Sequence, residues 1–236
     1  MNVAIIVAAG QGTRAGGRGD GGGGQAKQFR ELDGVPVIIH TLRRFEQSAL
    51  IGEVFAVGPA AQSSALLQLL KQYKIRKVAR VVAGGATRTE SVWRGLQAVR
   101  SATAEIVAVH DGVRPFVTPH EIDKTVRTAQ AHGAAILATS IVDTIKEIER
   151  GCVARTLERE GLRRALTPQC FRYELLRRAY ETALSENLTA TDDSALVERL
   201  GIPVAIVEGH PRNIKITRPE DFALAEVLLR DFPSSG

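Results

Sequence analysis

The chain has few cysteines and no long hydrophobic run. Among its 236 residues only Cys152 and Cys170 are cysteines, and their spacing fits no zinc site. A disulfide framework is therefore not expected, and a reducing, cytoplasmic setting is the simplest one. No apolar run approaches the roughly 20 residues of a membrane-spanning helix. We accordingly expect no membrane partner.

Aromatic residues are also scarce, at 5% of the chain, and no run of basic residues is interleaved with them. Proteins that bind single-stranded nucleic acid stack bases on aromatic side chains within a basic groove, so we expect no nucleic-acid partner. The net charge is +5 and the pI is near 9.5. These values suit an anionic ligand, although an arginine-rich surface would give the same numbers. A basic RNA-binding protein stays an alternative that a salt-dependent RNA shift assay would test.

Glycine, by contrast, is concentrated near the N-terminus. The apolar residues 3–9 predict a buried strand, which ends at Gly10 and leads into a glycine tract over residues 16–24. Glycines allow backbone N–H groups to approach a ligand closely. Arg14 and Lys27 place one cation at each edge of this loop. The combination predicts a polyphosphate site.

A dinucleotide-binding fold is the rival interpretation of this stretch. Gly10 and Gly12, followed by Ala15, fit its glycine pattern, and Asp33 lies at about the right distance for a ribose-binding acid. That fold requires a helix to begin inside the motif, whereas each interior glycine of residues 16–24 costs about 1 kcal/mol in a helix. A long loop is therefore favoured. Ordering about ten such residues costs on the order of 10 kcal/mol, so we expect the loop to order only over a nucleotide.

The remaining chain alternates short apolar runs with amphipathic segments. We expect further strands at residues 54–57, 78–83, 105–110, 134–139, 204–207 and 213–216, and helices from about residues 36, 66, 91, 118, 171, 192 and 217, with capping boxes at Thr118–Glu121 and Thr217–Glu220. This alternation predicts an α/β fold with a doubly wound, mostly parallel, Rossmann-like sheet. We expect one domain over residues 1–236.

Residues 141–160 break this rhythm. Apolar and polar residues alternate around Arg150-Gly151, which predicts a β-hairpin with glycine at its turn. A hairpin inserted between strands of the main sheet is expected to project as an arm. Such arms commonly contact a partner subunit, so we expect a homodimer, and sedimentation of a monomer alone at micromolar concentration would contradict it.

Polar clusters are expected at the carboxyl ends of the strands, where open parallel sheets bind ligands. They lie at residues 10–27, 84–91 and 111–114, and at Lys215 with Thr217. Asp111 could hold Mg²⁺, accept hydrogen bonds from sugar hydroxyls or cap its own loop. Arg114 could bind a phosphate or fix the same loop. Arg159 and Lys215, taken singly, could be surface charges.

Several motifs occur in the order found in sugar-phosphate nucleotidyltransferases. They are Ala8-Ala9-Gly10-Gln11-Gly12-Thr13-Arg14, Lys27-Gln28, Gly84-Gly85 with Arg88 and Ser91, His110-Asp111-Gly112-Val113-Arg114-Pro115, Asp143-Thr144-Ile145-Lys146, Leu166-Thr167-Pro168-Gln169, Thr191-Asp192-Asp193, and Asn213-Ile214-Lys215-Ile216-Thr217-Arg218-Pro219-Glu220-Asp221. Together they resemble the 2-C-methyl-D-erythritol 4-phosphate cytidylyltransferase family of isoprenoid biosynthesis. The resemblance extends from Val3 to about Leu229.

The resemblance implies roles for particular residues. It implies that the transition state at the α-phosphate of CTP is stabilised by Arg14, Lys27, Lys215 and Arg159; that the nucleotide is bound by Ala8, Ala9, Gly10, Gly12, Gly85, Ala86, Ser91, Asp111 and Gly112; and that a polyol phosphate acceptor is bound by Asp111, Arg114, Thr144, Arg159, Thr167 and Thr191. It further implies Mg²⁺ or another divalent cation, held mostly by the CTP phosphates with Asp111 as the candidate protein ligand. The acceptor's phosphate would attack the α-phosphorus in line, and pyrophosphate would leave.

The chain departs from the family pattern in four places. Ala26 replaces a common proline, Ala86 stands where an aspartate is frequent, Gly112-Val113 replaces a frequent Ala-Ala, and the stretch from Arg14 to Lys27 is longer and richer in glycine. Ribitol 5-phosphate as the acceptor is one alternative, and a nucleotide-binding module without catalysis is another. Arg14, Lys27, Asp111 and Lys215 together favour an enzyme, since binding alone does not require all of them.

Overall fold

The computed structural model of the chain describes residues 1–10, 26–100, 103–188 and 190–231. Within these ranges, one seven-stranded sheet has the order β11-β7-β10-β6-β1-β4-β5. Its strands are β1 (Asn2–Val7), β4 (Ile51–Gly58), β5 (Val78–Ala83), β6 (Ile106–Asp111), β7 (Ala134–Ser140), β10 (Arg163–Arg172) and β11 (Ala205–Glu208). Every described pairing in this sheet is parallel except those of β10 with β6 and β7. The predicted α/β fold with a mostly parallel sheet is confirmed.

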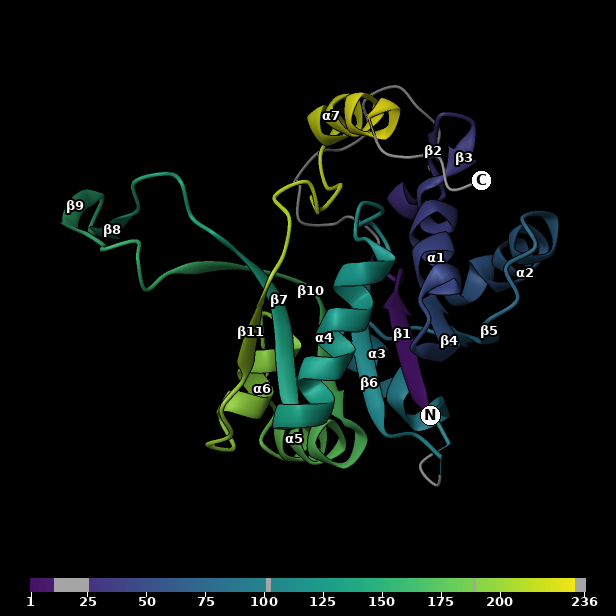
Figure 1. Ribbon diagram of the computed structural model, residues 1–236, viewed down its shortest axis with the longest axis horizontal. Coiled ribbons are helices and arrows are strands. Elements are labelled where there is room, and N and C mark those ends of the chain that lie inside the picture. Colours follow the sequence, from purple (N-terminus) through teal and green to yellow (C-terminus); the bar gives the residue numbers. More distant parts are fainter. Residues whose placement is uncertain (11–25, 101–102, 189, 232–236) are drawn as a thin grey trace.

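Helices cover both faces of this sheet (Figure 1). They are α1 (Val37–Gln47), α2 (Ser63–Gln72), α3 (Arg88–Ala98), α4 (Pro119–His132), α5 (Tyr173–Ser185), α6 (Asp193–Glu198) and α7 (Pro219–Arg230). Alternate residues of β1 belong to two different hydrophobic clusters. Ala4 and Ile6 pack with residues of α1, α2 and α4, whereas Val3 and Ile5 pack with residues of α3, α5 and α6. The continuous apolar sequence of β1 therefore reflects burial on both faces.

The strand β10 is absent from the sequence-based prediction. Residues from 171 were expected to begin a helix, but Phe171 is buried in β10 and α5 begins at Tyr173. Proline is normally confined to edge strands because it cannot donate a ladder hydrogen bond. Here Pro168 lies where the register of β10 against β7 shifts, between Ala165 and Gln169. The irregularity accommodates a proline in a central strand and hides the strand from pattern analysis.

Local capping signals determine several helix ends. The predicted capping box of α4 is confirmed, with Thr118 and Glu121 bonded reciprocally. Helix α3 begins three residues before its predicted start, because the Thr87 hydroxyl accepts a hydrogen bond from the Glu90 amide at 3.1 Å. The box predicted at Thr217–Glu220 is wrong by one position, because the N-cap of α7 is Arg218 and its third helical residue is Asp221. The carboxylate that accepts hydrogen bonds from the backbone before α7 belongs to Asp221.

A third hydrophobic cluster joins α7 to the rest of the molecule. Ile216 is fully buried in it, together with Phe116 and Phe222. The strand predicted at residues 213–216 is wrong, because this segment is extended without a neighbouring ladder. Its backbone link to the sheet region is the bond from the Ile216 amide to the Val113 carbonyl, at 2.9 Å. The cluster, not a sheet, therefore fixes this segment.

The predicted hairpin is confirmed as β8 (Lys146–Glu149) and β9 (Cys152–Thr156), which pair antiparallel. Arg150 and Gly151 form the turn, with φ of 50° and 81°, as two-residue hairpin turns of this hand require. The hairpin extends away from the main body (Figure 1), and every residue of both strands is exposed.

Among the described residues, no helix is long and apolar enough to cross a membrane.

Candidate active site

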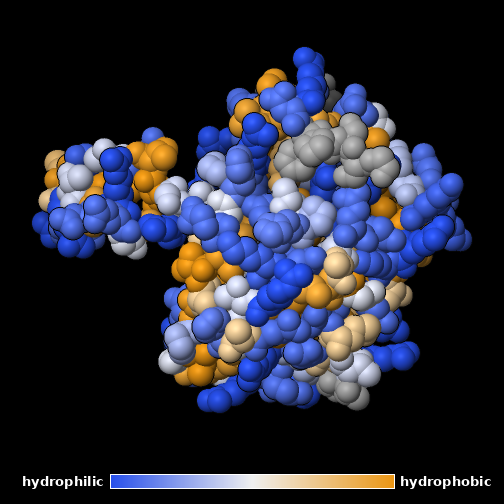
Figure 2. Space-filling view, viewed as in Figure 1, coloured by the Kyte–Doolittle hydropathy of each residue, from blue (hydrophilic) through white to orange (hydrophobic). Residues whose placement is uncertain are grey.

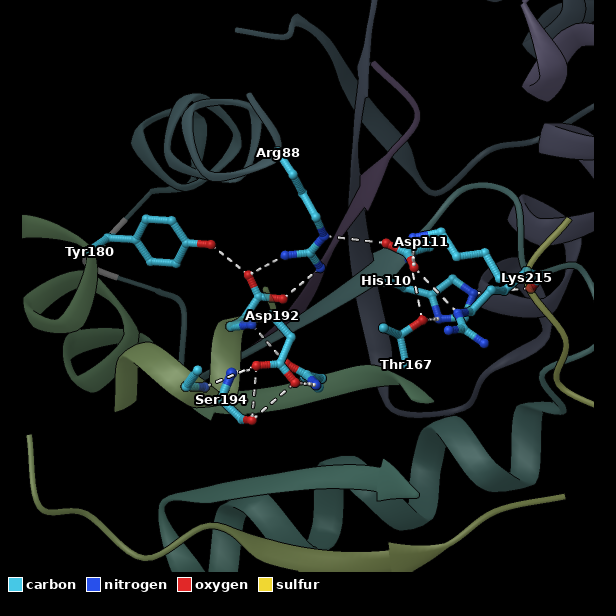
Figure 3. Close-up of polar contacts among 12 residues, drawn as sticks. Arg88, His110, Asp111, Thr167, Tyr180, Asp192, Ser194 and Lys215 are labelled. Atoms are coloured by element: carbon cyan, nitrogen blue, oxygen red, sulfur yellow. Dashed lines mark hydrogen bonds and ion pairs between the residues drawn. The ribbon is translucent and has the colours of Figure 1, made fainter. Parts of the chain in front are cut away.

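The carboxylate of Asp111 is the centre of a charged cluster at the carboxyl end of β6. Its oxygens lie 2.9 Å from Lys215 Nζ, 3.3 Å from Arg114 Nε and 3.4 Å from Arg88 Nε. These groups come from three segments of the chain, since Asp111 and Arg114 belong to the same one. Figure 3 shows Arg88 and Lys215 on either side of Asp111. The Asp111 side chain is only 9% exposed, so this is a nearly dry arrangement of one anion and three cations.

The cations determine the ionisation of Asp111. Burial by itself would raise the pKa of this carboxyl, but the attraction of Arg88, Lys215 and Arg114 outweighs burial and holds the pKa well below its usual range. Asp111 is therefore a carboxylate at any physiological pH. It can accept hydrogen bonds from hydroxyl groups or contact a cation, but it cannot donate a proton.

Lys215 and Arg114 are positioned by the extended segment before α7. Ile216 is fully buried and Ile214 partly buried, so the lysine between them is directed toward Asp111 with 41% of its side chain exposed. Arg114 follows β6 and donates through Nη1 to the Asn213 carbonyl at 2.8 Å. The predicted proximity of these two residues to Asp111 is observed.

Lys27 lies beside the same segment. It begins the short 3-10 helix η1 (Lys27–Phe29), and its ammonium donates to the Thr217 carbonyl, two residues from Lys215. The next residue, Gln28, is buried and donates to the Ala8 carbonyl at 2.6 Å, at the end of β1. The Lys27 ammonium thus contacts the segment that carries Lys215, although the two lysines lie far apart in the sequence. Arg14 and Gly12 lie outside the described residues, as does the glycine tract.

The residues predicted to bind the nucleotide line the ends of β1 and β6 and the loop before α3. Ala8 is buried, Ala9 partly buried and Gly10 exposed. A Cβ on Gly84 would lie 2.3 Å from that of Ala9, so only glycine permits this approach. A Cβ on Gly112 would meet Ile38 at 2.8 Å and Ala8 at 2.9 Å.

Ser91 and Glu90 shape the loop after Gly84. The buried Ser91 hydroxyl donates to the Thr87 carbonyl at 2.8 Å and accepts from the Gly85 amide at 3.1 Å. Ala86 is exposed, and its amide donates to the Glu90 carboxylate at 2.7 Å. Glu90 therefore supplies a carboxylate beside the position where the family often has an aspartate. The sequence analysis assigned Glu90 no role.

The residues predicted to bind the acceptor are not all in one place. Thr167 is buried beside Asp111, whose amide donates to its hydroxyl at 3.3 Å. Thr144 and Arg159 lie at the base of the arm, where Arg159 donates to the Val142 carbonyl at 2.7 Å. Thr191 is exposed just before α6. Within the described chain, Thr144, Arg159 and Thr191 make no hydrogen bond or ion pair with the charged cluster.

His110 lies directly behind the cluster and is fully buried. Its Nδ1 is 2.9 Å from the Thr167 hydroxyl, and its Nε2 is 3.1 Å from the Arg114 carbonyl. Burial disfavours the charged imidazolium and lowers the pKa of His110 to about 4. The ring is therefore neutral at physiological pH, and it links Thr167 of β10 to the loop that carries Arg114.

This burial predicts a pH dependence of stability. An unfolded histidine has a pKa near 6.5, so the unfolded chain takes up a proton that native His110 refuses. The stability of the native state is therefore not reduced by His110 above pH 6.5. As the pH falls from 6.5 to about 4, roughly 3 kcal/mol of unfolding free energy should be lost. His40, whose pKa burial also lowers, adds to this loss. Asp111 acts at lower pH, because its stabilisation is lost only below the pKa of an unfolded carboxyl.

Urea unfolding at pH 7, 5.5 and 4.5 measures this effect. We expect a shallower pH dependence for His110→Gln than for the unchanged protein, since the amide removes the titrating ring. Equal slopes for the two proteins would contradict the prediction.

Three residues near the cluster were missed as functional candidates. Arg88 and Asp193 lie within motifs of the family resemblance but received no role, and Tyr180 received none either. The guanidinium of Arg88 connects Asp111 to Asp193, and the Tyr180 hydroxyl donates to Asp193 at 2.5 Å. The pairing spans 105 residues between Arg88 and Asp193, so no local pattern could have found it.

Among the described residues, no group of three or more His, Cys, Asp or Glu side chains could hold a metal ion. Asp111 is the one described carboxylate that contacts all three cations. Mg²⁺ commonly binds one or two carboxylates together with substrate phosphates and waters. The donor set therefore fits a divalent ion that arrives with a nucleotide, and it does not fit an ion held by the protein alone.

Comparison with known proteins identifies the family of the chain. Residues 2–231 match the family described as IspD, 2-C-methyl-D-erythritol 4-phosphate cytidylyltransferase. The chain belongs to this family. A relative of that name from Geobacillus kaustophilus is 44% identical over 226 residues, covering 96% of each chain. One from Bacillus velezensis is 44% identical over 229 residues, covering 97% of this chain and 95% of the relative.

Solved structures show the same fold. The 4-diphosphocytidyl-2C-methyl-D-erythritol synthase from Anaerococcus prevotii has a TM-score of 0.84 and 31% identity, covering 97% of this chain and 95% of that one. The 2-C-methyl-D-erythritol 4-phosphate cytidylyltransferase from Thermus thermophilus has a TM-score of 0.77 and 34% identity, covering 98% and 100%. The resemblance inferred from the sequence motifs is confirmed, and the IspD family membership extends over nearly the whole chain.

Proposed function

We propose that the protein transfers CMP from CTP to 2-C-methyl-D-erythritol 4-phosphate, giving 4-diphosphocytidyl-2-C-methyl-D-erythritol and pyrophosphate in the non-mevalonate isoprenoid pathway. The observation that supports it is the convergence of Lys215, Arg114 and Arg88 on Asp111. Lys27 is bonded to the Thr217 carbonyl, two residues from Lys215. Membership of the IspD family supplies the reaction class. Ribitol 5-phosphate is not favoured as the acceptor.

The cations suit a reaction in which no side chain acts as a base. The acceptor's phosphate monoester is already an anionic nucleophile, so it attacks the α-phosphorus directly while pyrophosphate leaves on the opposite side. Lys27 and Lys215 stabilise the charge on the crowded phosphorus, and Arg14, outside the described residues, joins them. Catalysis then consists of alignment and charge neutralisation.

The remaining residues bind and orient the two substrates. Ala8, Ala9, Gly10, Gly85, Ala86, Ser91 and Gly112, together with Gly12, which lies outside the described residues, form the nucleotide side; Asp111, Arg114, Thr144, Arg159, Thr167 and Thr191 form the acceptor side. A divalent cation, Mg²⁺ in the simplest case, would supply charge neutralisation of the CTP phosphates, and Asp111 is the side chain that could hold it. The anionic state of Asp111 suits both a hydroxyl donor and a cation.

Pyrophosphate release tests this proposal. Each of the four nucleoside triphosphates is incubated with methylerythritol phosphate or ribitol phosphate, and the pyrophosphate formed is measured. We expect release only with CTP and methylerythritol phosphate, and only with a divalent cation present. Binding of CTP without release under any combination would point to a nucleotide-binding module instead.

We also propose a homodimer formed through the arm, residues 141–160. A two-stranded hairpin is marginally stable alone, and the arm exposes Val142, Ile148 and Val153, of which the last two pair across the strands. Figure 2 shows the arm as a separate lobe with both hydrophobic and polar surface. A partner covering these side chains would place Thr144 and Arg159 near a second copy's acceptor site.

Sedimentation tests the dimer. We expect a dimer at micromolar concentration, and a shift toward monomer for the variant with Ile148→Asp and Val153→Asp, since charges oppose burial of the paired positions. The control Leu67→Asp, at an exposed apolar residue of α2, should leave the dimer intact. A monomeric unchanged protein would contradict the proposal.

We propose a cytoplasmic location, as for an enzyme acting on small phosphorylated metabolites.

A further inference from the structure

The three cations around Asp111 are held in different ways. The Lys215 side chain, which is 41% exposed, contacts Asp111. Besides Asp111, the Arg114 guanidinium binds the Asn213 backbone carbonyl. Arg88 is anchored by a second carboxylate. Its Nη1 and Nη2 donate to the two oxygens of Asp193 at 3.0 and 2.7 Å, and its Nε faces Asp111 at 3.4 Å. Such a fork-to-fork pair has a defined orientation that a single bond lacks.

Asp193 is itself fixed from several sides. It is fully buried at the start of α6 and accepts the Tyr180 hydroxyl at 2.5 Å. Its amide donates to the Gln169 side chain at 3.0 Å, and Gln169 lies in the central strand β10. The ring of Tyr180 stacks on Trp93 of α3, the helix that begins with Arg88 (6.3 Å between centroids). Figure 3 shows the Arg88 side chain between Tyr180 and Asp111, and the contacts with Asp193 complete the path between them.

The anchoring has a consequence for the charges. Asp193 neutralises Arg88 inside the protein, so an incoming phosphate attracts Arg88 only weakly. The Arg88 side chain therefore keeps its orientation toward Asp111. Lys215, in contrast, can leave Asp111 and follow a phosphate without disturbing any other described contact of its ammonium. When Lys215 moves, Arg88 still holds Asp111.

We propose that Arg88, anchored by Asp193 and Tyr180, is a positioning residue that fixes the Asp111 carboxylate while Lys215 and Arg114 engage the substrate phosphates. The proposal rests on the proposed cytidylyltransferase activity and adds to it the assignment of these three residues. Arg88 itself acts through Asp111 and is not assigned a contact with the reacting atoms.

Kinetics of Asp193→Asn and Arg88→Lys test the proposal. The first variant removes the charge that anchors the guanidinium, and the second keeps a cation that cannot bridge two carboxylates. Each should lower kcat on the order of 10²-fold, the usual effect of a displaced positioning group. The KM for CTP should change less than about threefold, since uniform binding is retained. Tyr180→Phe, which removes one hydrogen bond and keeps the ring, should give a smaller loss of the same kind.

A double-mutant cycle separates positioning from general damage. In an Asp111→Asn background, followed under single-turnover conditions, the additional Asp193→Asn change should slow the reaction less than about threefold. The matched control is Asp192→Asn. Asp192 caps the same helix through the Ala195 amide at 3.1 Å and has no described contact with Arg88. Asparagine caps helices about as well as aspartate, so this variant should retain both kcat and the unfolding midpoint. If Asp193→Asn still slowed the reaction 10²-fold in the Asp111→Asn background, the proposal would be overturned. An equal loss of kcat in the Asp192→Asn control would overturn it as well.

A crystal structure of Asp193→Asn provides a test that does not depend on turnover. We expect the Arg88 guanidinium and the Asp111 carboxylate to have left their contact, and an unchanged Asp111 would overturn the proposal. If the unchanged protein releases no pyrophosphate, the cytidylyltransferase function fails, and this structure still decides the assignment of Arg88.

Discussion

Replacement of Asp111 by alanine is expected to lower both stability and activity. The change leaves Arg88, Arg114 and Lys215 without their shared counter-charge in a nearly dry environment. Breaking a buried ion pair by removing one partner typically costs about 3–5 kcal/mol. Turnover should fall on the order of 10²–10³-fold. The hydroxyl groups of the acceptor lose the carboxylate that accepts their hydrogen bonds, and the three cations repel one another.

Urea unfolding and pyrophosphate release measure these two effects. Glu181→Ala is the matched control, because it removes the carboxylate from an ion pair with Arg177 in which both side chains are about half exposed. Exposed pairs contribute little, so this variant should barely change the urea midpoint. An Asp111→Ala protein as stable as the unchanged one would show that the three cations are not compensated by this carboxylate.

Replacement of Lys27 by alanine is expected to affect catalysis alone. Loss of one positioned cation in such a site typically costs on the order of 10²–10³ in rate, or roughly 3–4 kcal/mol of transition-state stabilisation. The fold should change little, because the Lys27 side chain makes one described hydrogen bond, to the Thr217 carbonyl. The measurement is turnover at saturating CTP together with the thermal unfolding midpoint.

Lys124 offers a control for the loss of a lysine as such. It is exposed on α4, away from the charged cluster, and Lys124→Ala should retain both turnover and midpoint. Turnover of Lys27→Ala equal to that of the unchanged protein would reject the role of this residue. A large fall in its unfolding midpoint would instead assign Lys27 to the packing of η1 against the segment before α7.

Features that depend on neighbouring residues could be predicted from the sequence. The Thr118–Glu121 capping box, the Arg150-Gly151 turn and the alternating strands and helices each follow from the preferences of a few adjacent residues. The strand pattern placed Asp111 and Arg114 at the end of one strand, which is confirmed, and Lys215 in another strand, which the structure does not contain within the described residues. Since parallel strands end at a common edge, their proximity could be expected as well.

Features that depend on distant residues could not be predicted. The central strand β10 carries Pro168 and is recognisable only from the two neighbouring strands that pair with it. The segment of residues 213–216 alternates like a strand, yet burial of Ile216 beneath α7 fixes it without a ladder. In both cases the surroundings of the segment outweighed its local pattern.

The sequence by itself determined the fold class, the family and the set of charged residues available for phosphate chemistry, because periodicity and motif order are properties of the linear chain. Only the tertiary structure decided which charges meet. Asp193 lies 105 residues from Arg88, and Lys27 lies 190 residues from Thr217. The strength of an ion pair depends on distance and burial, and neither quantity exists until the sheet has brought these segments to one edge.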